Sequence, residues 1–123
     1  MGEYIDATSG YPRSLILRWN GTSWSRLTSP NLGVSTQLQE VALVSSGNVW
    51  AVGDYYSSPS VGKTFTARWN GTSWSRVSSP NAGSELDRLW RASRVPGTNQ
   101  VWAVGEYSAS AAPVVRTLTE RYC

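Results

Sequence analysis

The sequence predicts an all-β protein built from a repeated unit, and two repeated motifs carry the prediction. The nine residues Arg-Trp-Asn-Gly-Thr-Ser-Trp-Ser-Arg at positions 18–26 return unchanged at positions 68–76, 50 positions later. A second motif, Val-Trp-Ala-Val-Gly, stands at positions 49–53 and again at 101–105, an offset of 52. Self-similarity at a period of about 50 residues is the signature of a fold that stacks copies of one supersecondary unit.

Each unit is expected to hold four short strands. The first covers residues 39–44 and again 89–95, and it closes on a Ser-Gly-Asn or a Pro-Gly-Thr-Asn turn. The second is the Val-Trp-Ala-Val-Gly run, whose apolar residues on both faces predict a strand packed between two layers. The third, residues 64–69, places Phe65, Ala67 and Trp69 on one face. The fourth, residues 73–78, carries Trp74 and is stopped by Ser-Pro-Asn.

Asn-Gly joins the third strand to the fourth at Asn20-Gly21 and at Asn70-Gly71. This dipeptide between β-prone segments is the strongest short hairpin signal, because both residues tolerate positive φ. The same positions satisfy the Asn-X-Thr pattern for N-glycosylation. The hairpin turn is the preferred explanation, and glycosylation of Asn20 or Asn70 stays open.

Four antiparallel strands per unit of about 50 residues are typical of one blade of a β-propeller. The order Val-Trp-Ala-Val-Gly followed by Arg-Trp-Asn-Gly-Thr-Ser-Trp resembles repeats of bacterial β-propeller proteins, distantly similar to kelch and Asp-box propellers. The resemblance covers essentially the whole chain and implies a fold rather than an activity. We therefore expect one domain over residues 1–123: a partial blade (1–30), a complete blade (31–80) and a partial blade lacking its last strand (81–123).

The strand count predicts that the chain completes itself with other copies. It holds about two and a half blades, whereas a closed propeller takes at least about four. A single chain would expose tryptophan-rich faces and unpaired sheet edges. We expect a head-to-tail homo-oligomer, ring or filament, in which residues 22–29 of one copy supply the missing strand of another. Because residues 1–20 and 104–123 duplicate each other, one third strand would be surplus, or the chain is a piece of a longer propeller.

Composition and charge exclude several function classes. No segment approaches the roughly 18–20 consecutive apolar residues that cross a bilayer, so no membrane insertion is expected. The net charge of +3 comes from scattered arginines rather than a basic stripe, which argues against nucleic-acid binding. The only cysteine is the last residue, Cys123, so no internal disulfide is expected.

The sequence offers no catalytic, cofactor or metal site. There is no histidine, and no phosphate-binding Gly-rich loop, Cys cluster or acidic calcium loop. Asp54 and Glu106 occupy equivalent positions in different units, and such positions are expected to lie too far apart for a glycosidase pair. We expect neither an enzyme nor a cofactor.

The functional expectation is a non-enzymatic, self-assembling binding or structural module, extracellular or at a cell surface. The alternative is a multivalent carbohydrate-binding lectin with sites at blade loops or junctions, because aromatic rings offer apolar faces to sugars and repeated weak sites give avidity. The ligand-binding candidates for that alternative are Trp24, Trp74, Asp54, Tyr55, Glu106 and Tyr107. Packing between blades is the expected role of Trp19, Trp50, Trp69 and Trp102.

Overall fold

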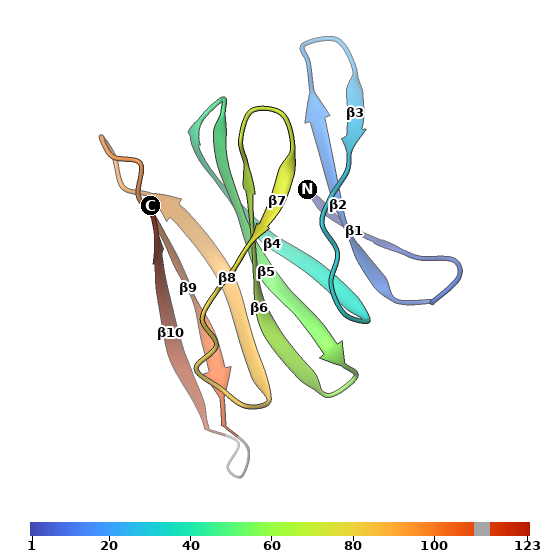
Figure 1. The fold of residues 1–123 in the computed structure, drawn as a ribbon, viewed down its shortest axis with the longest axis vertical. Coiled ribbons are helices and arrows are strands. Elements are labelled where there is room, and N and C mark those ends of the chain that lie inside the picture. Colours follow the sequence, from blue (N-terminus) through green and yellow to red (C-terminus); the bar gives the residue numbers. More distant parts are fainter. Residues whose placement is uncertain (110–113) are drawn as a thin grey trace.

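The structure, a computed structural model that describes residues 1–109 and 114–123, is all-β, as predicted (Figure 1). The described residues hold no helix, and hence none that could cross a membrane. An N-terminal sheet contains β1 (Gly2–Ile5), β2 (Pro12–Trp19) and β3 (Trp24–Leu27). A middle meander contains β4 (Ser35–Ser45), β5 (Asn48–Ser58), β6 (Val61–Trp69) and β7 (Trp74–Val77). A C-terminal meander contains β8 (Leu86–Arg94), β9 (Val101–Ser108) and β10 (Val115–Tyr122).

The pairing between neighbouring strands is antiparallel within each of these three groups. A single parallel pair, Gly62 with Leu86, joins the middle and C-terminal meanders into one seven-stranded sheet. Both sheets are open, since no described strand of one end pairs with the other end. The sequence predicted two strands at the N-terminus, the third and fourth of a unit. The structure has three, because β1 also forms and pairs with β2.

The two meanders share one register, which explains the glycine that ends each Val-Trp-Ala-Val-Gly motif. Gly53 pairs with Leu38 and Phe65, and Gly105 pairs with Leu89 and Leu118. A bulge follows Leu38 in β4 and Leu89 in β8 at the same register position. The neighbouring strand therefore approaches each glycine so closely that a Cβ on Gly53 would overlap the backbone carbonyl of Gln37. Only glycine fits at this point of the motif.

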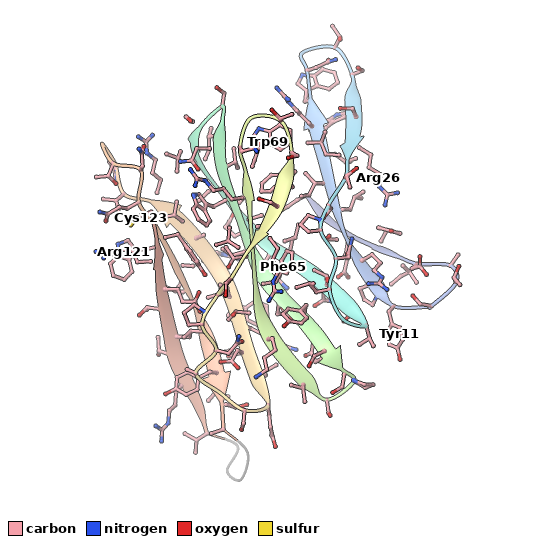
Figure 2. All side chains as sticks on the ribbon, in the orientation of Figure 1. Tyr11, Arg26, Phe65, Trp69, Arg121 and Cys123 are labelled. Carbon is pink, nitrogen blue, oxygen red and sulfur yellow. The ribbon has the colours of Figure 1, made fainter. Side chains whose placement is uncertain are left out.

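Two apolar clusters stack the three layers. Between the N-terminal sheet and the middle meander lie Ile16, Leu38, Ala51, Phe65 and Ala67. Between the middle and C-terminal meanders lie Ala42, Val44, Trp50, Val52, Leu89, Val101, Ala103, Leu118 and Tyr122. β5 sends side chains to both clusters, which confirms the predicted strand buried on both faces. Figure 2 shows Trp69 near the tip of the β6–β7 hairpin and Phe65 further down the middle meander.

The same prediction is wrong for β9 within this chain. Val101 and Ala103 are buried against the middle meander, whereas Trp102 and Val104 on the opposite face are 46% and 43% exposed. The motif is the same as in β5, and only the neighbouring layer differs. A strand in the middle of the stack is covered twice and a strand at its end is covered once.

Both Asn-Gly hairpins form, although by a different turn from the predicted one. Four residues, 20–23 and 70–73, connect the strands, and only the glycines have positive φ, 103° at Gly21 and 99° at Gly71. Asn70 keeps negative φ and accepts hydrogen bonds at its Oδ1 from the backbone N–H groups of Thr72 and Ser73, each at 2.9 Å. The side chain of asparagine therefore holds the turn, and the backbone freedom is needed at glycine alone.

Replacing Gly71 by alanine tests this description of the turn. The substitution forces an L side chain into positive φ, so we expect the free energy of unfolding to fall by about 1–2 kcal/mol. Gly47→Ala is the matched control, because Gly47 lies in the adjacent β4–β5 turn without positive φ and with no close neighbour for a Cβ. Urea denaturation of the two variants measures the difference. Equal stabilities would contradict the turn geometry.

Candidate functional site

The two copies of the nine-residue repeat build the same pair of tilted, contacting indoles in two different surroundings. Trp19 pairs with Trp24 across the β2–β3 hairpin, with ring centroids 5.5 Å apart and planes at 46°. Trp69 and Trp74 across the β6–β7 hairpin lie 5.9 Å apart, also at 46°. Trp69 is buried, whereas Trp24 is 66% exposed. The repeat therefore determines the geometry of each tryptophan pair, whereas the neighbouring layer determines how far the pair is exposed to solvent.

A groove of about 520 Å³ lies between these hairpins. In Figure 1 the β2–β3 hairpin rises beside the β4–β5 and β6–β7 hairpins at one end of the molecule. The N-terminal sheet and the residue before it contribute Met1, Ile16, Leu17, Arg18, Trp19, Trp24 and Leu27 to the lining. The middle meander contributes Val41, Leu43, Ser46, Val49, Ala51, Trp69 and Trp74. The groove thus brings together the two lectin candidates Trp24 and Trp74, which the sequence reasoning left in separate units.

The chemistry of this groove is apolar. Among the described residues that line it, Arg18 and Ser46 are the only ones with polar side chains other than the indoles. The indole N–H of Trp69 already donates to the backbone carbonyl of Ser46 at 3.2 Å, and the indole nitrogen of Trp74 is buried without a partner. The guanidinium of Arg18 lies 5.7 Å from the ring of Trp69. Such a lining favours an apolar or aromatic occupant over one that needs many hydrogen bonds.

The other four lectin candidates lie outside this groove. Asp54 is fully buried between the middle and C-terminal meanders, with one carboxylate oxygen 3.8 Å from Nε of Arg88. Tyr55 packs edge-on against Phe65 with Arg76 over its ring. Glu106 and Tyr107 are half-buried on β9, and Tyr107 packs against the cluster between the meanders. These side chains therefore do not share one surface with Trp24 and Trp74.

Of the residues expected to pack between blades, Trp50 and Trp69 are buried within the chain. Trp50 stacks on Tyr122 with centroids 5.0 Å apart and planes at 30°. Trp19 and Trp102 are about half exposed, because each lies where the chain provides no further layer. Their role in packing stays a prediction.

Burial raises the pKa of the Asp54 carboxyl, and the nearby Arg88 guanidinium partly opposes that rise. Because the pKa is higher in the folded than in the unfolded chain, protonation of Asp54 favours folding. The contribution is present below the unfolded pKa and is lost as pH rises through the folded pKa.

The variant Asp54→Asn tests that linkage, since it imitates the protonated carboxyl at every pH. We expect the wild type to gain stability relative to the variant as pH falls from neutral to about 4. Urea denaturation of both proteins at the two pH values measures the change, and groups common to both proteins cancel in the difference. A wild type that loses stability relative to the variant on acidification would contradict the burial of Asp54.

A second buried polar group escaped the sequence reasoning. Glu120 of β10 stands at the register position of Ala67 in β6, so a carboxylate replaces a methyl group. Ser79 donates to its Oε2 at 2.6 Å, and the hydroxyl of Tyr122 also donates to that oxygen. The hydroxyls of Tyr122 and Thr66 are 2.9 Å apart. Burial and the Glu120 carboxylate raise the pKa of the Tyr122 hydroxyl. The signal was visible in Leu-Thr-Glu-Arg-Tyr set beside Phe-Thr-Ala-Arg-Trp.

The described residues contain no cluster of three or more His, Cys, Asp or Glu side chains placed to hold a metal ion. Comparison with protein-family models, with curated proteins and with solved structures found no match for this chain.

Proposed function

We propose that this chain is a self-assembling β-propeller module whose role is binding or assembly rather than catalysis. One observation carries the proposal: the Val-Trp-Ala-Val face that is covered in β5 is bare in β9. Trp50 and Val52 are buried against the C-terminal meander, and their counterparts Trp102 and Val104 face solvent. A contiguous apolar face of this kind is typical of an interaction surface.

The order of the layers supports a head-to-tail contact. The exposed face of the C-terminal meander carries Trp102 and Val104, whereas the groove at the other end of the stack carries Trp24 and Leu43. Two different surfaces that fit each other make a heterologous contact, which closes into a ring or continues as a filament. In this proposal each copy contributes incomplete blades, and its neighbour completes them.

A lectin function has weaker support. Sugar recognition needs several hydrogen-bonding side chains beside an aromatic platform. In the described part of the chain, the groove shared by Trp24 and Trp74 supplies only Arg18 and Ser46. The acidic candidates lie elsewhere, and Asp54 is fully buried. The apolar groove therefore favours a protein partner.

The molar mass in solution tests the proposed function. Light scattering on a size-exclusion column at micromolar concentration is expected to give a multiple of the 13.5 kDa chain mass. Val104→Lys places a charge on the exposed face of β9 and is expected to return the mass to that of one chain. Ile5→Lys is the control, because Ile5 is 62% exposed on β1 and lies neither in the C-terminal meander nor in the groove lining. A soluble wild-type monomer at this concentration would reject the proposal.

A further inference from the structure

The edge of β2 is half open. β1 pairs with β2 from Gly2 opposite Leu15 to Ile5 opposite Pro12, so in the described chain residues 16–19 have a strand partner on one side only, namely β3. In the middle meander the equivalent residues 66–69 of β6 pair with residues 49–52 of β5. In the C-terminal meander residues 119–122 of β10 pair with residues 101–104 of β9. Both filled positions hold the sequence Val-Trp-Ala-Val.

The apolar groove follows this open edge. All four residues 16–19 line it, although consecutive side chains of a strand point to opposite faces. The groove therefore reaches residues on both faces of this stretch of β2, the stretch that β1 leaves unpaired. Trp24 and Leu27 of β3 extend the lining on the paired side, and the middle meander forms the opposite wall.

The contact between the two meanders shows how such a strand packs. There Trp50 stacks on Tyr122, and the guanidinium of Arg68, opposite Trp50 in the ladder, lies 5.3 Å from its ring. The groove already holds the counterparts of both contacts. Trp69 stands at the register position of Tyr122, and Arg18 stands at that of Arg68, with its guanidinium 5.7 Å from the Trp69 ring. A tryptophan opposite Arg18 would find a stacking surface and a cation in place.

The chain itself offers a segment of this chemistry. Residues 101–104 read Val-Trp-Ala-Val, and Trp102 and Val104 are exposed on one face of β9. β9 is held by β8 on one side and by the edge strand β10 on the other. Exchange of β10 for β2 of another copy would replace one antiparallel ladder by an equivalent one, which is the low-cost route of strand swapping.

We infer that the groove is a strand-binding site, filled by residues 101–104 of a second copy in antiparallel pairing with residues 16–19. The register sets Val101 opposite Trp19, Trp102 opposite Arg18, Ala103 opposite Leu17 and Val104 opposite Ile16. Main-chain hydrogen bonds supply affinity, and the pocket for Trp102 supplies specificity. Residues 105–108 of the donor then pair with the first part of β2, and β1 is displaced from that position. The choice of a second copy as the donor rests on the proposed function. The strand-binding site itself rests on the register and the lining of the groove.

A synthetic peptide tests the strand-binding site independently of the identity of the donor. The probe is Asn-Gln-Val-Trp-Ala-Val, residues 99–104, with N-terminal lysines for solubility, titrated into the Val104→Lys chain, whose groove is intact. We expect saturable binding and slower hydrogen exchange of backbone amides within residues 16–19. A peptide with Trp102→Ala is expected to bind at least about tenfold more weakly.

Variants of the acceptor locate the binding. Leu43→Lys puts a charge on a groove residue that is 64% exposed, so the fold is retained while peptide binding falls by about tenfold or more. Arg18→Ala is expected to weaken binding about two- to fivefold, and Arg26→Ala, on the same hairpin but outside the groove, to leave it unchanged. Absence of saturable binding, or binding that survives Leu43→Lys, would overturn the strand site even if the wild type assembles. A wild type that binds the peptide yet stays monomeric would reject the second copy as donor.

Discussion

Replacement of Trp50 by alanine is expected to lower the free energy of unfolding by about 3–5 kcal/mol. Trp50 is 3% exposed, stacks on Tyr122 and lies in the cluster that joins the middle and C-terminal meanders. The substitution removes a large apolar surface and leaves a cavity between layers that cannot close without moving β10. Urea denaturation followed by far-UV circular dichroism measures the loss. If the variant is too unstable to purify, the conservative Trp50→Phe is expected to show a smaller loss in the same direction.

The same substitution in the second copy of the motif is the matched control. Trp102 has the register position of Trp50 and is 46% exposed, so Trp102→Ala is expected to cost less than about 1 kcal/mol in the isolated chain. Its main effect should appear in the oligomer mass at higher concentration. Equal losses for the two variants in dilute solution would mean that the stacking of layers is not as described.

The second large effect is expected at Gly53. A Cβ at this position overlaps the backbone carbonyl of Gln37, and a backbone atom cannot rotate away as a flexible side chain can. Gly53→Ala must therefore separate β4 from β5 beside the bulge, at a cost of about 3 kcal/mol. Gly105→Ala is expected to behave alike, because its Cβ would meet the carbonyl of Arg88 at the equivalent bulge of β8.

Gly2 supplies an internal control for this prediction. It pairs with Leu15 of β2, as Gly53 pairs with Phe65 of β6, but nothing lies within 4 Å of its Cβ position. Gly2→Ala is therefore expected to change the free energy of unfolding by less than about 0.5 kcal/mol. Thermal unfolding of the three alanine variants ranks them. A destabilised Gly2→Ala beside an unaffected Gly53→Ala would contradict the close approach of β4 to β5.

The repeat made much of the fold predictable. Hydrophobic alternation and the Asn-Gly turns are local signals, and they located the third and fourth strands of both units to within a few residues. The same signals predicted that Phe65, Ala67 and Trp69 share a face, and Phe65 and Ala67 lie together in the cluster against the N-terminal sheet. The motif Val-Trp-Ala-Val also predicted the two-sided burial of β5, because an apolar residue at each successive position leaves no face for water.

What the sequence could not predict depends on contacts between layers. Identical motifs have opposite exposures in β5 and β9, so exposure follows from place in the stack and not from residue type. Asp54 was a candidate ligand-binding residue, yet it is fully buried beside Arg88, which is distant in the sequence. The apolar groove arises because β1 pairs with only the first part of β2. The residues of β2 themselves carry no pattern that shows which of them lack a partner strand.

The head-to-tail account is tested most directly by mixing two variants that are each blocked at one surface. Leu43→Lys blocks the groove and leaves β9 intact, whereas Val104→Lys blocks β9 and leaves the groove intact. Light scattering should give the mass of one chain for each variant alone. The mixture should give a 1:1 heterodimer of twice that mass and nothing larger, because only one complementary pair of surfaces remains. Monomers after mixing, or continued assembly of either variant alone, would contradict the account.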